Sequence, residues 1–327
     1  MNTSELRNFI KKTPCILGEG AVIERLRRAT NFELDPHIVN SAFIYDEYKR
    51  AALERIYRGY MDTGYEFNLP LVLSTPTWRA NQSRIKDAGF EAYDVNADNY
   101  RFLDALRKSY GDYGEKIIIC GLMSCRGDAY FPGDGLSFED AREFHRWQAE
   151  KLAGAGVDFI LAATLPALDE AKGLAFALAG TEIPYIISFI ARPEGTILEG
   201  TPLKTAIAEI DAAVSLKPLA YMINCTHASF VKAALMHETN SSPVVRERII
   251  GLFANTAALS PEELNNSTEL VEEDPEIFGK AVAELNKSLG FKILGGCCGT
   301  DDRHIRALAS ELVKGESTPG FLITASK

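Results

Sequence analysis

The sequence contains no apolar run long enough to span a membrane, and residues 1–12 mix charge with apolar side chains, without the apolar core of a signal peptide. Basic residues are the minority charge: 35 Lys and Arg stand against 45 Asp and Glu, for a formal net charge of -10 at pH 7. This balance argues against nucleic acid or an anionic membrane as a partner. We therefore expect a protein that handles small molecules.

Internal repeats, low-complexity segments and linkers are also absent, so we expect residues 1–327 to form a single domain. A disulfide framework is not indicated, because six cysteines are few for 327 residues and two of them are adjacent. This composition fits a reducing compartment, and we expect the protein to be cytoplasmic. The local zinc signatures CxxC and HExxH do not occur. Any metal site must therefore combine residues that lie far apart in the chain.

What the sequence does contain is a series of short apolar runs with helical patterns between them. Their continuous apolar character indicates strands buried on both faces, which is typical of parallel sheets covered by helices. Eight such units in one chain predict an α/β protein with a closed (β/α)8 TIM barrel. The expected strands are 15–17, 69–74, 116–123, 159–163, 183–189, 219–224, 249–253 and 291–295.

Two of the expected strands lead directly into cysteines. Cys225 follows the sixth run, and Cys297 and Cys298 follow the eighth, within Gly-Gly-Cys-Cys-Gly. The C-terminal ends of barrel strands share one rim, so we expect these three thiols to meet there. Three protein ligands and one open position are typical of catalytic Zn²⁺, whereas a structural site more often has four ligands. The sequence therefore predicts a zinc site.

These motifs resemble those of the homocysteine S-methyltransferase family, the zinc-dependent domain of betaine- and S-methylmethionine-homocysteine methyltransferases. Asn224-Cys225-Thr226 resembles the first ligand motif of the family, and Gly-Gly-Cys-Cys-Gly at 295–299 resembles the second. The likeness runs nearly end to end. It implies a barrel that binds Zn²⁺ through Cys225, Cys297 and Cys298. It also implies transfer of an activated methyl group to a small thiol, homocysteine in the family, which yields methionine.

The sequence departs from the family at two acidic positions. Glu19 stands where the family usually has an aspartate, and Ala163 precedes Thr164 where the family has a glutamate. That glutamate resembles a ligand for the amine of homocysteine, so its loss makes a related thiol an alternative acceptor. We predict substrate contacts from Glu19, for an ammonium group, and from Thr164. Arg192 and Arg126, in loops after strands, are candidates for binding a carboxylate.

Other functions remain open on the sequence alone. The chain could be a methyl-transfer subunit that works with a separate corrinoid protein, or a non-catalytic zinc- and thiol-binding barrel with a fourth ligand such as His227. A covalent cysteine nucleophile without metal is a further alternative, although no base is evident for it. The remaining cysteines, Cys15, Cys120 and Cys125, are expected in the core. The methyl donor and the oligomeric state are not specified by the sequence.

Overall fold

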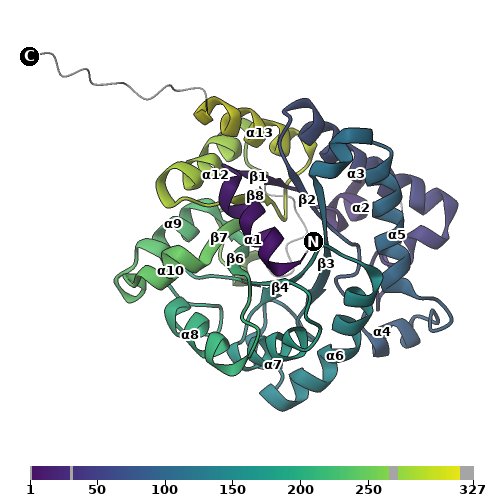
Figure 1. Ribbon diagram of the computed structural model, residues 1–327, viewed down its shortest axis with the longest axis horizontal. Helices are drawn as coiled ribbons and strands as arrows, with labels where there is room; N and C mark the ends of the chain where they lie inside the picture. The colour runs from purple at the N-terminus through teal and green to yellow at the C-terminus, as the bar shows by residue number, and fades with distance from the viewer. Residues whose placement is uncertain (1, 30–31, 265–271, 317–327) are drawn as a thin grey trace, which may run out of the picture.

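The computed structural model describes residues 2–29, 32–264 and 272–316. Eight parallel strands form a closed barrel in chain order, with β8 pairing back onto β1, which confirms the predicted (β/α)8 fold (Figure 1). Each predicted strand is present. The strands are β1 (Ile16–Gly18), β2 (Leu71–Ser74), β3 (Ile117–Ser124), β4 (Phe159–Leu165), β5 (Tyr185–Phe189), β6 (Ala220–His227), β7 (Ile249–Asn255) and β8 (Ile293–Gly296).

Helices surround the ring of strands, as Figure 1 shows. Within the described residues, no helix is both long enough and apolar enough to cross a membrane. The α-helices are α1 (Thr3–Lys12), α2 (Ile23–Ala29), α3 (Glu47–Glu66), α4 (Gln82–Asp87), α5 (Val95–Lys108), α6 (Phe138–Ala155), α7 (Leu168–Ala179), α8 (Leu203–Ala213), α9 (Ala228–Met236), α10 (Pro243–Arg248), α11 (Pro261–Leu264), α12 (Pro275–Leu289) and α13 (Asp302–Glu316).

Helix α1 covers one end of the barrel and lies across the ring of strands in Figure 1. A capping box begins it, in which Asn2 and Glu5 each accept a hydrogen bond from the other's backbone amide. Leu6 and Ile10, one turn apart, are buried in the same apolar cluster as interior strand residues such as Phe159. This packing closes the N-terminal end of the barrel, so the C-terminal ends of the strands form the accessible rim.

Candidate metal and substrate site

Cys225, Cys297 and Cys298 converge at the C-terminal rim, and we call them the cysteine triad. Cys225 lies in β6, and the other two directly follow β8. The Sγ atoms of Cys225 and Cys297 are 2.7 Å apart, and all three Sγ atoms lie within 4.8 Å of one another. Cys225 is buried and the other two are half-buried. Residues 72 positions apart in sequence are thus brought within reach of one ion.

Close backbone packing fixes the two adjacent thiols. The Cys297 amide donates to a carbonyl of β7 at 2.7 Å, and the Cys298 amide donates to Asn255 Oδ1 at 3.1 Å. Gly299 has a φ of 84°, and a Cβ atom at this position would lie 1.9 Å from Thr256 Oγ1. Only glycine fits both the conformation and the space. The glycine after the two thiols is therefore a requirement of the packing.

Cys225 reaches the triad through an irregularity in its strand. The sequence predicted a strand end at residue 224, but β6 continues to His227, with a register shift against β7 between Asn224 and Thr226. Cys225 has a φ of 52°, in a region that non-glycine residues seldom adopt. Asn224 supports this geometry, because its Oδ1 accepts a 2.9 Å hydrogen bond from the Thr164 amide. The bulge thus sets the position of the Cys225 thiol at the rim.

The three close sulfurs shift one another's pKa values. The pKa of Cys297 is raised well above its usual value by hydrogen bonds with Cys225 and Cys298, and also by burial. The pKa of Cys298 is lowered well below its usual value, because the Cys225 and Cys297 thiols donate hydrogen bonds to its thiolate. Negative charge on one sulfur thus opposes the ionisation of Cys297 beside it. A bound metal ion would allow all three to lose their protons.

A fourth protein ligand for the triad would have to come from a side chain close to the three sulfurs. Among the described residues, no other Cys, His, Asp or Glu places a ligand atom in the same group. His227 is engaged elsewhere, with Nδ1 2.7 Å from Ser229 Oγ and Nε2 3.7 Å from Glu273 Oε2. An ion bound by the triad would retain an open coordination position.

A cavity of about 350 Å³ opens onto the triad. Trp78, Leu122 and Ala163 contribute to its mainly apolar wall, and Glu19 lies within it. The Glu19 side chain accepts a 3.1 Å hydrogen bond from the Ser74 amide, and the residue is 7% exposed. Burial raises the pKa of Glu19 to about 8. Glu19 is therefore a neutral acid at pH 7 unless a cation binds beside it.

Thr164 lines the same cavity and also holds part of its wall. Its hydroxyl lies 2.7 Å from Ser124 Oγ and accepts a 3.2 Å hydrogen bond from Trp78 Nε1. Its φ of 55° marks a second bulge, in β4, where the sequence predicted that the strand had ended at Ala163. Thr164 is thus placed to orient Trp78. Direct contact between Thr164 and a substrate stays a prediction.

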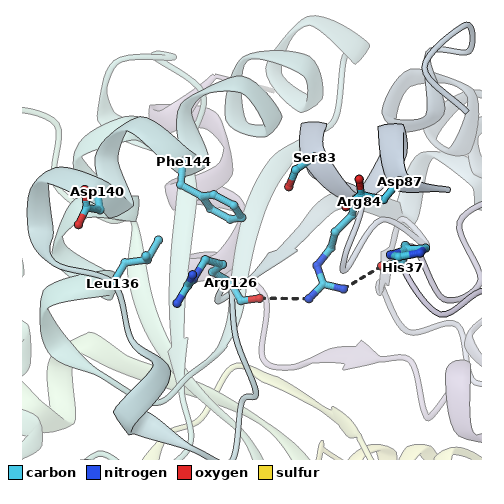
Figure 2. A pocket seen from close by; sticks show the side chains of 8 residues that line it. All are labelled: His37, Ser83, Arg84, Asp87, Arg126, Leu136, Asp140 and Phe144. Atoms are coloured by element: carbon cyan, nitrogen blue, oxygen red, sulfur yellow. Dashed lines mark hydrogen bonds between the residues drawn. The ribbon is translucent and has the colours of Figure 1, made fainter. Parts of the chain in front are cut away.

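The structure does not bring the two predicted arginines to the cavity, because neither Arg126 nor Arg192 lines it. The Arg192 guanidinium forms an ion pair with Glu262 and donates to the Leu198 carbonyl. Arg126 lines a separate surface groove, where its carbonyl accepts a hydrogen bond from Arg84, as Figure 2 shows. That a residue follows a strand predicts its position at the rim of the barrel, but not the direction in which a long side chain points.

The cavity residues that the sequence reasoning did not find include Tyr130 and Arg27. Tyr130, in the loop between β3 and α6, lines the cavity beside the triad, and burial followed by the charge of Cys225 raises its pKa well above the usual value. Arg27, on α2, is the only Lys or Arg among the described residues of the cavity lining. No motif distinguishes either residue. Only the fold shows that these two segments reach the rim.

Comparison with known proteins agrees with this architecture. The family model described as homocysteine S-methyltransferase matches residues 16–312. Homocysteine S-methyltransferase 4 from Zea mays is 28% identical over 192 residues, which cover 56% of this chain and 53% of that protein. Betaine-homocysteine S-methyltransferase 1 from Bos taurus is 22% identical over 337 residues, which cover 95% of this chain and 75% of that protein.

A solved structure shares the fold. The metallated form of the homocysteine methyltransferase MmuM from Escherichia coli has a TM-score of 0.71 at 20% identity, and the match covers 93% of this chain and 99% of that one. The chain spans about half the length of plant relatives such as the Zea mays protein. Because the family model covers most of the sequence, the chain belongs to the homocysteine S-methyltransferase family.

Proposed function

We propose that this protein is a zinc-dependent S-methyltransferase that moves an activated methyl group onto a small thiol, either homocysteine or a related thiol. The observation that carries the proposal is the cysteine triad, whose three sulfurs face one cavity without a fourth protein ligand among the described residues. A metal site saturated by the protein would leave no position for a substrate. The open position therefore favours catalysis over a purely structural role.

The donor set fits zinc, because sulfur ligands from three cysteines suit this ion and the open position is typical of its catalytic sites. Zinc bound there would supply the positive charge that favours the thiolate form of a substrate thiol. A free thiol near its ordinary pKa of about 8.5 is mostly protonated at neutral pH. In the transfer, a lone pair of the acceptor sulfur forms the new S–CH₃ bond while the donor takes the electrons of the bond that breaks.

The chain's own residues would bind and align the reactants. Both Glu19 and Arg27 line the cavity; Glu19 would pair with an ammonium group, and Arg27 would attract a carboxylate. Trp78, held by Thr164, forms an apolar wall that limits access of water. Alignment of donor and acceptor in such a cavity is the main contribution that a protein makes to a direct transfer.

Ala163 is the residue that we expect to set the choice of acceptor. Its small side chain lines the cavity where the family has a glutamate. Ala163→Glu should increase the ratio of kcat/KM for homocysteine to kcat/KM for its des-amino analogue by about 10-fold or more, because a charge-assisted hydrogen bond contributes roughly 1.5 to 3 kcal/mol. Steady-state kinetics with both thiols measures the ratio. An unchanged ratio in a folded, zinc-loaded variant would contradict this assignment.

Arg27 is expected to favour acceptors that carry an anionic group. Arg27→Met should raise KM for a carboxylate-bearing thiol by about 5-fold, the size of a solvent-accessible charge pair of about 1 kcal/mol. Arg192→Met, which removes a guanidinium engaged with Glu262, is the matched control and should leave KM unchanged. Steady-state kinetics of both variants, with acceptors that do or do not carry a carboxylate, would show which arginine affects KM. A larger effect at Arg192 would restore the role predicted for it from the sequence.

The activity is tested with a panel of acceptor thiols against one sulfonium donor, with zinc content measured on the same sample. We expect stoichiometric zinc and methylation of homocysteine or of a thiol related to it. A parallel arm adds a methyl-corrinoid protein, to test the alternative that transfer needs such a partner. A stoichiometric zinc protein that methylates no thiol in either arm would overturn the proposal.

A further inference from the structure

The loop between β3 and α6, residues 125–137, carries three cavity residues, Asp128, Ala129 and Tyr130, whose placement needs an explanation. Ala129 and Tyr130 lie in the middle of this loop, and both line the cavity beside the cysteine triad. The loop has no strand partner, and its only regular element is the single 3₁₀ turn Pro132–Asp134. Tyr130 packs against the main apolar core, and contacts at the two ends of the loop help to set the path of the chain that brings it there.

Glu170, on α7, contacts both ends. Its Oε1 accepts a hydrogen bond from the Arg126 amide at 2.6 Å, and its Oε2 accepts one from the Leu136 amide at 3.3 Å. Glu170 is fully buried. A buried carboxylate that bridges two backbone amides ten residues apart fixes the distance between the loop ends.

His145, on α6, completes the arrangement. Its Nε2 lies 3.0 Å from Glu170 Oε1, and both side chains are 1% exposed. Burial opposes ionisation of Glu170, but the hydrogen bonds from His145 and the Arg126 amide outweigh it and keep the pKa of Glu170 below its usual value. Because an ionised carboxylate only accepts hydrogen bonds, His145 must donate through Nε2.

Arg79 also holds the start of the loop, through backbone carbonyl groups. Its Nη1 donates to the carbonyls of Cys125, Arg126 and Gly127, at 3.3, 2.9 and 2.6 Å. The same guanidinium packs over the Trp78 ring, 4.3 Å from its centroid. Arg79 therefore holds the loop carbonyls while Glu170 holds the loop amides, and Trp78, in the cavity wall, packs on this contact.

We propose that Glu170 and His145 are positioning residues: Glu170 bridges the Arg126 and Leu136 amides, His145 holds the Glu170 carboxylate, and together they hold loop 125–137 so that Tyr130 stays against the cysteine triad. Neither residue lines the cavity, so they act through the loop and not by contact with substrate. The inference rests on the proposed function only for the measurement of kcat/KM. The state of the loop is measured independently of any activity.

The test compares zinc-loaded wild type with Glu170→Gln, which is close in shape but presents an NH₂ group where a carboxylate oxygen accepted a hydrogen bond. The matched control is Glu143→Gln, an exposed residue of α6 that pairs with Arg146. In Glu170→Gln we expect backbone amide exchange in residues 125–137 to rise at least ~10-fold and kcat/KM to fall ~10- to 100-fold, as for other supporting contacts around metal sites. Zinc content should stay stoichiometric, because the triad is untouched.

A double-mutant cycle with Tyr130→Phe separates positioning from general destabilisation. If Glu170 and His145 act by placing Tyr130, Glu170→Gln should lower kcat/KM by less than ~2-fold in the Tyr130→Phe background. Equal losses in both backgrounds would overturn the proposal, as would loop exchange or kcat/KM unchanged from wild type in Glu170→Gln. Loss of zinc in that variant would also overturn it.

A second pair of variants covers the case in which Glu170→Gln does not fold. His145→Leu removes the donor and should reproduce the faster loop exchange, whereas His145→Gln offers an amide donor and should restore slow exchange. Equal rates of loop amide exchange in these two variants would contradict the positioning role of Glu170 and His145. A wild type without methyl transfer would defeat the proposed function alone, because the exchange measurements would still decide how the loop is held.

Discussion

Replacing Cys298 by alanine is expected to abolish stoichiometric metal binding and to lower methyl transfer by at least ~100-fold. The three Sγ atoms form one group within 4.8 Å, so removal of one leaves two thiols that cannot complete the site. Changes to groups that merely support metal ligands already cost about 10- to 100-fold in affinity or activity, and loss of a ligand should exceed this. Metal analysis of the purified variant, followed by kinetics, measures both effects.

Cys15→Ala is the matched control for this experiment. Cys15 is a buried cysteine that directly precedes β1, at the N-terminal end of that strand. The control should keep its zinc and its activity, with at most a modest loss of thermal stability from a small cavity. Full zinc content and activity in Cys298→Ala would remove the basis for the metal assignment.

Glu19→Gln is expected to remove the pH dependence of binding for acceptors that carry an amine. The pKa of Glu19 is raised by burial to about 8, so the side chain is neutral at lower pH and cannot pair with an ammonium without losing its proton. In the wild type, kcat/KM for such an acceptor should rise with pH up to about 8 and then level off. At pH 8.5, kcat/KM of Glu19→Gln for this acceptor should be roughly 10- to 100-fold below that of wild type, which corresponds to the loss of a charge-assisted hydrogen bond.

A des-amino acceptor is the control, since its pH profile should be the same in wild type and Glu19→Gln. The shift also affects stability. A carboxyl group whose pKa is higher in the folded chain than in the unfolded chain binds a proton on folding, so stability falls as pH rises from about 4.5 to about 8. Glu19→Gln should therefore unfold at a higher temperature than wild type at pH 8. If the pH profile of kcat/KM for an amine-bearing acceptor were the same in wild type and Glu19→Gln, Glu19 would be excluded from substrate binding.

The sequence was sufficient for the barrel and for the convergence of the thiols, because both follow from general rules. Continuous apolar runs separated by helices specify a parallel barrel, and a parallel barrel places every strand end at the same rim. Cys225 and Cys297 could therefore be placed together although one lies in β6 and the other follows β8. Glu19, which was identified through the family resemblance, follows β1 directly and lines the cavity.

The sequence was not sufficient for the details that depend on local irregularity or on long side chains. The bulges at Thr164 and Cys225 are linked by the hydrogen bond from the Thr164 amide to Asn224 Oδ1, which no sequence periodicity predicts. Arg126 and Arg192 follow strands but turn toward other partners, whereas Arg27 reaches the cavity from a helix. Positions near an active rim are thus predictable, but the direction of flexible side chains at that rim is not.

X-ray absorption spectroscopy at the zinc edge, on protein with and without acceptor thiol, tests the central claim most directly. We expect three sulfur neighbours for the ion in the protein alone and four when the thiol is added. Fewer than three sulfurs in the wild type, or a coordination shell that does not change with any thiol, would contradict a site that three cysteines build and a substrate completes.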